Sequence, residues 1–202
     1  RDQLTLSEKE LDSKYVISIP LQKGAVAVPS GVVSGQNVIV KLNEYTASVH
    51  EIQDFYEFPI PFACYATDLE TGEAVELNTG YLPYALRATS SFPSFFKPVL
   101  LDGKLYADGG IVKNFPVMAT RKKGLDIIIG VDVQANLYCR EDLNSVFKIL
   151  DQTSSFLNKK EMDLEIAEAD IYIAPDLEGY SVADFDKGDK LIKLGHKAAL
   201  ER

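Results

Sequence analysis

The segment from Leu105 to Pro116 constrains the fold of this chain more than any other. It begins with an apolar run that predicts a strand, and Asp108 stands at the end of that strand. Gly109 and Gly110 follow where the chain has to turn, because glycine adopts backbone conformations that other residues avoid. Pro116 suits the first turn of a helix. The pattern predicts a carboxylate held at a strand end, which is typical of catalytic acids and bases and also of ordinary strand–turn–helix junctions.

Strand and helix patterns alternate along the rest of the chain, which predicts an α/β fold. The expected strands are Tyr15–Leu21, Ala25–Val28, Phe58–Leu69, Ala74–Leu77, Val99–Leu101, Lys104–Ala107, Asp126–Val133 and Asp170–Ala174. The expected helices are Gln36–Val49, Leu82–Ala88, Pro116–Lys123, one starting near Leu143, and Ser181–Leu200. Asp102-Gly103 predicts a hairpin turn. Asp126–Val133 has the nearly continuous apolar character of an interior parallel strand, flanked by the helices that begin near Pro116 and Leu143.

The length and the net charge of the chain limit the kinds of function it can have. The 202 residues amount to one domain or most of one, and 46% hydrophobic content with 25% charged residues is typical of a globular protein. The net charge of −9 argues against nucleic acid as a partner. Cys64 and Cys139 are far apart, and two separate buried thiols are favoured over a disulfide. Neither cysteine has metal-ligand spacing.

Several motifs, taken together, resemble the patatin-like phospholipases. They are Ala66-Thr67-Asp68-Leu69 with Thr71-Gly72, Leu86-Arg87-Ala88-Thr89-Ser90-Ser91-Phe92-Pro93, and Asp108-Gly109-Gly110 with Asn114 and Pro116. The resemblance runs from Arg1 to about Arg202. It implies a three-layer α/β sandwich with a mainly parallel central sheet, lipid or phospholipid as substrate, and acyl hydrolysis by a Ser-Asp dyad. It implies no metal and no cofactor.

The resemblance also assigns roles to individual residues. Asp108 matches the aspartate of the dyad, which would act as the general base. Gly109 and Gly110 would leave backbone room for the acyl group, and Asn114 would brace the turn. Asp68, which ends a buried strand, is expected to be a structural carboxylate bonded to nearby backbone N–H groups.

The nucleophile of that dyad has no match in this sequence. Residues 1–202 contain no Gly-x-Ser-x-Gly and no glycine-rich loop that would form an oxyanion hole. Ser34 has the wrong spacing to its glycines and is interpreted as the cap of the Gln36–Val49 helix. We therefore expect residues 1–202 to be the C-terminal portion of a single patatin-like domain, incomplete at its N-terminal side and inactive alone. The alternative is a catalytically inactive domain that binds lipid or a partner.

The two histidines, a cluster of phenylalanines and the C-terminal segment each allow more than one interpretation. His50 and His196 stand outside every motif, so surface or helix positions are expected for them. Phe92, Phe95 and Phe96 suit core packing, although an acyl chain or a peripheral membrane contact would also fit such a cluster. The segment from residue 181 to 199 resembles the end of the patatin domain in exported bacterial proteins, which favours a bacterial envelope or secreted location.

Overall fold

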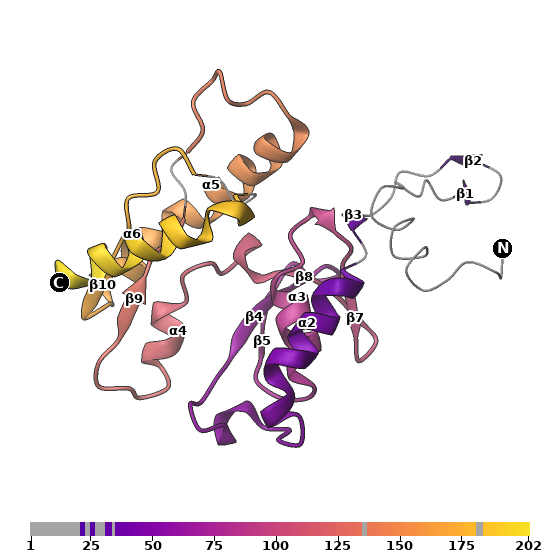
Figure 1. Cartoon of the computed structure of the whole chain (residues 1–202), viewed down its shortest axis with the longest axis horizontal. Helices are drawn as coiled ribbons and strands as arrows, with labels where there is room; N and C mark the ends of the chain where they lie inside the picture. Colours follow the sequence, from indigo (N-terminus) through magenta and orange to yellow (C-terminus); the bar gives the residue numbers. More distant parts are fainter. Residues whose placement is uncertain (1–20, 23–24, 27–30, 34, 135–136, 181–183) are drawn as a thin grey trace.

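The computed structural model describes residues 21–22, 25–26, 31–33, 35–134, 137–180 and 184–202 (Figure 1). Most of the strand expected over Tyr15–Leu21 and the cap expected at Ser34 lie outside these residues. Short strands β1 (Leu21–Gln22) and β2 (Ala25–Val26) pair antiparallel. Figure 1 shows two groups of elements, one around a four-stranded sheet and the other around a two-stranded parallel pair.

The four-stranded sheet has the order β5-β4-β8-β7, and all three of its strand pairs are antiparallel. Its strands are β4 (Cys64–Asp68), β5 (Ala74–Leu77), β7 (Val99–Leu101) and β8 (Lys104–Asp108). The predicted hairpin is confirmed between β7 and β8, where Asp102 and Gly103 have φ angles of 50° and 80°. Positive φ angles at both loop positions give a turn whose twist matches that of the two strands it joins.

Two predictions about this sheet were wrong. The largest sheet in the described part of the chain is antiparallel: short connections join β4 to β5 and β7 to β8, and β8 also runs antiparallel to β4. Strand β4 begins at Cys64 instead of Phe58. Pro59 and Pro61 explain the late start, since proline has no N–H to donate to a neighbouring strand. The α/β class itself is confirmed.

Two helices accompany this sheet, α2 (Gln36–Thr46) and α3 (Leu82–Thr89), and a 3₁₀ turn, η1 (Ala47–Val49), follows α2. Residue Gly35, with φ 79°, occupies the cap position of α2. Ala88 of α3 packs against Ala66 of β4 and Tyr106 of β8 in a small core. A second core forms around Phe55 in η2 (Phe55–Glu57), and burying a side chain of that size contributes about 1.5–3 kcal/mol.

The second group of elements follows the Asp-Gly-Gly turn. Its members are η3 (Gly109–Ile111), α4 (Val117–Arg121), β9 (Ile129–Val131), α5 (Val146–Ala167), β10 (Ile171–Ile173), η4 (Phe185–Lys187) and α6 (Gly188–Leu200). Strands β9 and β10 pair parallel. Phe115, Val117 and Ile128 form its core against Met162 and Ile166 of α5. The last helix begins at Gly188 and is shorter than the expected Ser181–Leu200, whose first three residues lie outside the description.

Strand β9 is shorter than the predicted Asp126–Val133, and it is not an interior strand among the described residues. Its side chains alternate, so that Ile128 is buried while its neighbours on the other face are exposed. The exposed side chains are Ile127, Ile129, Val131 and Val133, at 68%, 58%, 49% and 67%. The flanking helices α4 and α5 lie where the sequence predicts them.

One strand pair was not predicted. Residues 31–33 form β3 (Gly31–Val33), and it pairs parallel with β6 (Ser94–Phe96). Neither strand shows a period-two apolar pattern long enough to identify it, because each has three residues.

Candidate active site

Asp108 lies at the end of β8, as predicted, and three hydrogen bonds hold it there. Its side chain accepts a hydrogen bond of 2.7 Å from the backbone N–H of Gly110. Its backbone N–H donates to the carbonyl of Ser91 at 3.1 Å, and the hydroxyl of Thr67 donates to its carbonyl at 2.8 Å. The bonds to Ser91 and Thr67 fix the main chain of Asp108, and the bond from Gly110 holds its carboxylate.

Gly109 and Gly110 are required for space. A Cβ atom on Gly109 would lie 2.1 Å from the carbonyl oxygen of Tyr65, a distance that no real contact of this kind shows. A Cβ atom on Gly110 would lie 2.8 Å from Oδ1 of Asn114 and 3.1 Å from Oδ1 of Asp108. The first glycine therefore lets the turn pack on the backbone of β4, and the second keeps room between the carboxylate and Asn114.

Behind Ser91 stands a buried arginine from the second motif. The Arg87 side chain donates to Oγ of Ser91 at 2.6 Å and to the carbonyl of Lys97 at 3.1 Å. Its guanidinium also lies 4.5 Å from the centre of the Phe96 ring. Arg87 thus positions Ser91, whose carbonyl in turn holds Asp108. The packing role favoured for the phenylalanine cluster fits Phe96.

A cavity of about 790 Å³ opens beside this turn. Asp108, Gly109, Gly110 and Asn114 all line it, so the structure brings the four predicted site residues together. Its apolar wall comes from the chain before β4 and from the residues on either side of α4; this wall comprises Pro61, Phe62, Ala63, Pro116 and Leu125. A volume of this size is typical of a site for a small organic ligand.

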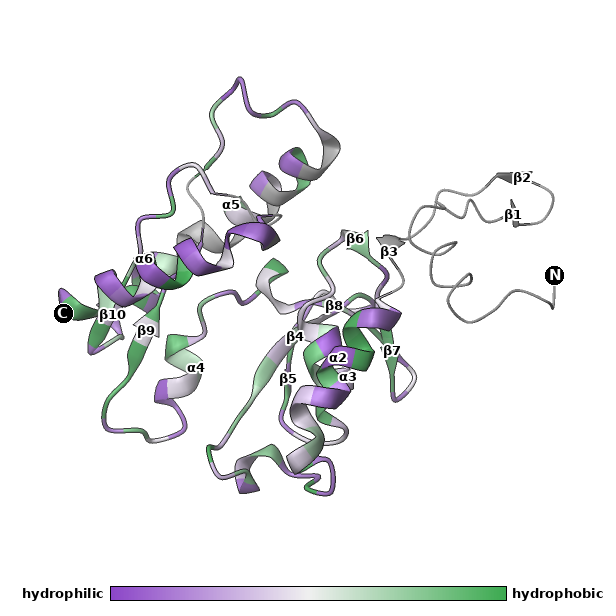
Figure 2. Cartoon of the chain, in the orientation of Figure 1, coloured by the Kyte–Doolittle hydropathy of each residue, from purple (hydrophilic) through white to green (hydrophobic). Residues whose placement is uncertain are grey.

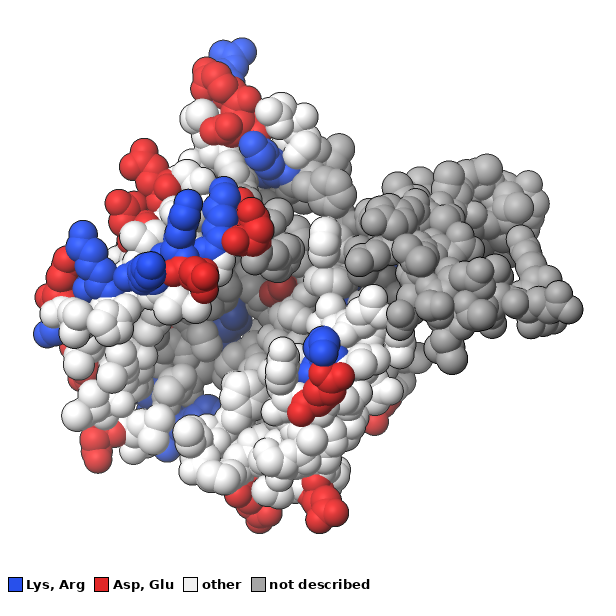
Figure 3. Space-filling view, in the orientation of Figure 1, with Lys and Arg blue, Asp and Glu red and all other residues white. Residues whose placement is uncertain are grey.

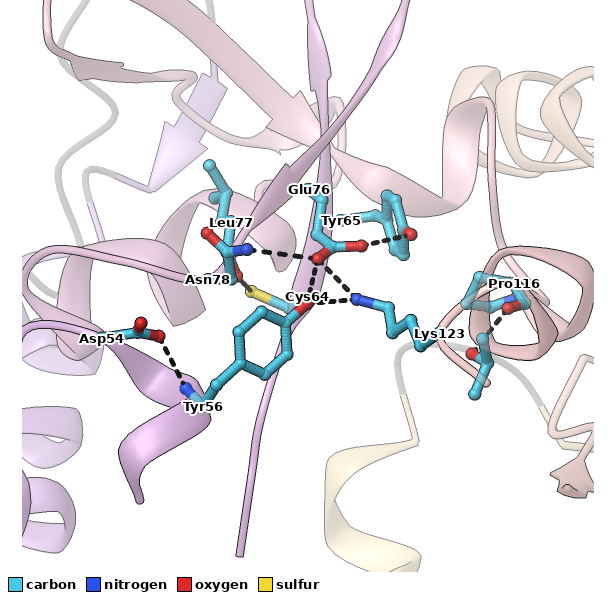
Figure 4. A network of polar contacts seen from close by, with 10 residues as sticks. Asp54, Tyr56, Cys64, Tyr65, Glu76, Leu77, Asn78, Pro116 and Lys123 are labelled. Carbon is cyan, nitrogen blue, oxygen red and sulfur yellow. Dashed lines mark hydrogen bonds and ion pairs between the residues drawn. The ribbon is translucent and has the colours of Figure 1, made fainter. Parts of the chain in front are cut away.

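A polar cluster at the cavity joins the two groups of elements (Figure 4). Glu76 of β5 accepts hydrogen bonds from Tyr65 at 2.7 Å, from Tyr56, and from the ammonium of Lys123 at 2.6 Å. Lys123 also donates to the Tyr56 hydroxyl and lies 4.8 Å from the centre of that ring. Three of these residues line the cavity, so the cluster ties the chain after α4 to the sheet.

The environment shifts the pKa of several groups here. Burial raises the pKa of Asp108, and the Gly110 N–H offsets only part of that rise. Burial also raises the pKa of Glu76, but hydrogen bonds from Lys123, Tyr56 and Tyr65 outweigh it and lower the pKa to about 2. Burial raises the pKa of the Cys64 thiol to about 11. A carboxylate with a raised pKa in a cavity is a better proton acceptor than an exposed one.

The remaining candidates lie away from this turn. Asp68 is 1% exposed, accepts from the backbone N–H groups of Glu70 and Thr71 at 2.9 and 3.4 Å, and pairs with Lys104 at 3.4 Å. These hydrogen bonds bear out the predicted geometry. The two histidines do not line the cavity: His50 contacts Thr46 and Tyr81, and His196 is exposed on α6.

The two cysteines are free, as predicted, but they differ in environment. Cys64 is half-buried and lines the cavity, whereas Cys139 is exposed, which contradicts the prediction that both are buried. Cys139 donates to the carboxylate of Asp142 at 2.9 Å.

Sequence reasoning missed the polar cluster. Tyr65 and Glu76 face each other directly across the β4–β5 pair, so the register of that hairpin could have indicated them. No local signal indicates Tyr56 or Lys123, because the contact joins residues 47 positions apart between Glu76 and Lys123.

The fold and site thus define an α/β protein in which a glycine turn presents a carboxylate of raised pKa to a ligand-sized cavity. Residues 41–121 match the family model for patatin-like phospholipases. That span contains β4, α3 and the Asp-Gly-Gly turn, so this part of the chain is similar to the patatin-like phospholipases.

Similar proteins from several organisms are named as phospholipases or as NTE family proteins. Lysophospholipase NTE1 of Meyerozyma guilliermondii is 26% identical over 176 residues, which is 75% of this chain and 12% of the relative. A patatin-like phospholipase domain-containing protein of Caenorhabditis elegans is 28% identical over 169 residues, covering 70% of this chain and 12% of the relative. An uncharacterized NTE family protein of Mycobacterium tuberculosis is 35% identical over 80 residues, or 40% of this chain and 22% of its own length. The chain therefore spans between about an eighth and a fifth of these relatives.

Proposed function

We propose that this chain supplies the aspartate of a lipid acyl hydrolase that works through a Ser-Asp dyad, with Asp108 as the general base. The observation that carries the proposal is the position of Asp108, which is held by three hydrogen bonds, half-buried, and open to the cavity. Its raised pKa supports the same role, because a base that holds a proton more readily removes one more readily from a serine hydroxyl.

Gly109, Gly110 and Asn114 complete the proposed site. The two glycines leave backbone space beside the carboxylate, where an acyl group can approach. The side-chain oxygen of Asn114 lies close to Gly110. The apolar wall of the cavity suits the hydrocarbon part of a lipid substrate.

The proposal places the nucleophilic serine outside residues 1–202, which would then be the C-terminal portion of one patatin-like domain. The exposed apolar face of β9 supports this, since parallel strands are usually covered on both faces. Under this proposal, the preceding part of the domain covers that face and brings the serine to Asp108.

A covalent phosphonate probe tests the location of the nucleophile. The full-length protein is labelled with a fluorophosphonate, digested, and analysed by mass spectrometry. We expect the labelled serine in a Gly-x-Ser-x-Gly segment outside residues 1–202. Labelling of a serine within these residues, such as Ser90 or Ser91, would contradict the proposal, and denatured protein serves as the control for nonspecific reaction.

A further inference from the structure

The last helix carries a surface that the proposed hydrolysis does not use. None of the helices in the described ranges combines the length and apolar character needed to cross a membrane. Helix α6 instead lies on the surface, and Figure 3 shows basic side chains gathered along it. In a chain with 30 acidic and 21 basic residues, such a gathering is unusual.

The lysines of α6 share one stripe of the helix. Lys190, Lys193 and Lys197 are three and four residues apart, a spacing that places side chains on the same side. All three are exposed. Asp189 and Glu201 lie four residues from Lys193 and Lys197, but with Lys190 and Arg202 the segment from residue 188 to 202 still carries two more basic than acidic side chains.

Beside the lysines lies an exposed apolar stripe. Ile192 is 71% exposed and Leu200 is 75% exposed, and Ala199 adjoins them. Together with Lys193, His196, Lys197 and Glu201, the two large side chains line one shallow, open depression. The opposite face of the helix, with Leu191, Leu194 and Ala198, is half-buried. Figure 2 shows the resulting alternation of apolar and hydrophilic residues along α6.

We propose that α6 docks this protein on an anionic lipid surface, with its lysines on the headgroups and Ile192 and Leu200 in the interface. Lysines beside exposed large apolar side chains are the pattern of helices that lie in the plane of a membrane. The charge is complementary only to an anionic surface, and the contact orients a strongly acidic molecule with this one face toward the lipid. A protein partner could use the same isoleucine and leucine, so the oligomeric state measured below separates that occupant from lipid.

The expected size of the effect follows from the lysines. Each lysine close to an anionic membrane strengthens partitioning roughly fivefold, so losing three weakens it on the order of 100-fold. Because the attraction between exposed charges is screened within about 10 Å at 0.1 M salt, added salt weakens binding as well. Replacing Ile192 and Leu200 by serine removes the apolar part and lowers binding at every salt concentration.

The test is co-sedimentation of the full-length protein with vesicles of phosphatidylglycerol and phosphatidylcholine in equal amounts, and with vesicles of phosphatidylcholine alone. We expect binding to the mixed vesicles, a loss of that binding in the triple variant Lys190→Gln, Lys193→Gln, Lys197→Gln, and a loss in Ile192→Ser, Leu200→Ser. The matched control is Lys41→Gln, Lys97→Gln, Lys122→Gln, which removes the same charge from exposed positions elsewhere and keeps binding.

Two results would contradict the proposal that α6 binds a lipid surface. One is binding of the triple α6 variant as tight as that of the matched control. The other is no binding of the wild type to mixed vesicles, combined with a change of oligomeric state in Ile192→Ser, Leu200→Ser, which would assign the face to a protein contact. The inference is separate from the proposed catalysis, because Asp108→Asn is expected to lose ester hydrolysis and still bind vesicles.

Discussion

Gly109→Ala gives the sharpest test of the turn that presents Asp108. The new Cβ would lie 2.1 Å from the carbonyl oxygen of Tyr65, so about 1 Å of movement is needed to restore a normal contact. Tyr65 lies in β4, paired with β5 on one side, and its carbonyl accepts a hydrogen bond from Thr89. The backbone on that side is therefore fixed, and the turn has to move.

The expected cost follows from overpacking. Forcing an extra carbon into a close-packed site costs about 1–3 kcal/mol, and the clash with backbone places this case at the upper end. The smaller entropy of the unfolded alanine chain returns about 0.4–1 kcal/mol. The free energy of unfolding should fall by about 2 kcal/mol, which lowers the melting midpoint of a chain of this size by about 4–8 °C.

Denaturant unfolding followed by circular dichroism or tyrosine fluorescence measures this change, since the chain has ten tyrosines and no tryptophan. The matched control is Gly195→Ala in α6, where a Cβ meets nothing within 4 Å. That change should raise stability by up to about 1 kcal/mol, because alanine is the better helix former. Equal stability of Gly109→Ala and the wild type would refute the packing argument.

Three further outcomes are expected. Lys123→Met and Glu76→Gln should each lower the free energy of unfolding by about 1–2 kcal/mol. This is less than the loss expected for a fully buried ion pair, because the two side chains are 29% and 25% exposed. Additive effects in the double variant would contradict a direct interaction between them. Asp108→Asn should be more stable than the wild type at neutral pH. Because the pKa of Asp108 is higher in the folded protein than its value near 3.8 in the unfolded chain, the folded wild type binds more protons above pH 3.8. The stability of the wild type therefore falls as the pH rises from 3.8 through the pKa of the folded protein. The difference should vanish below that pH, and an equal difference at all pH values would rule out titration of Asp108 as its cause. A thiol reagent should label exposed Cys139 before half-buried Cys64, whose pKa of about 11 keeps it protonated, and faster labelling of Cys64 would show that it is not covered.

The local features of this fold could be predicted because short-range chemistry determines them. Asp102-Gly103 gives the hairpin, and Asp108 with its two glycines gives the strand end and the turn. The residue spans of α3 and β5 agree with the predicted helix and strand to within one residue. In each case a turn residue or an apolar period sets the boundary within a few positions of the chain.

Strand direction and long-range contacts could not be predicted in the same way. The direction of β4, β5, β7 and β8 depends on which strands become neighbours, and apolar patterns do not encode that. The Lys123–Glu76 contact depends on how the chain after α4 returns to the sheet. Strand β9 has the composition of a buried strand, yet its outer face is exposed among the described residues, because burial depends on what packs against it.

The role of Asp108 is tested most directly by kcat/KM for ester hydrolysis by the full-length protein with Asp108→Asn. Asparagine keeps the size of the side chain and can still accept the Gly110 hydrogen bond through its amide oxygen, but it cannot take a proton from a serine hydroxyl. General-base assistance is worth about 10²–10⁴-fold, so we expect kcat/KM to fall by at least about 100-fold while circular dichroism stays unchanged. A folded Asp108→Asn protein that hydrolyses the ester at a rate close to that of the wild type would contradict the assignment of Asp108 as the base.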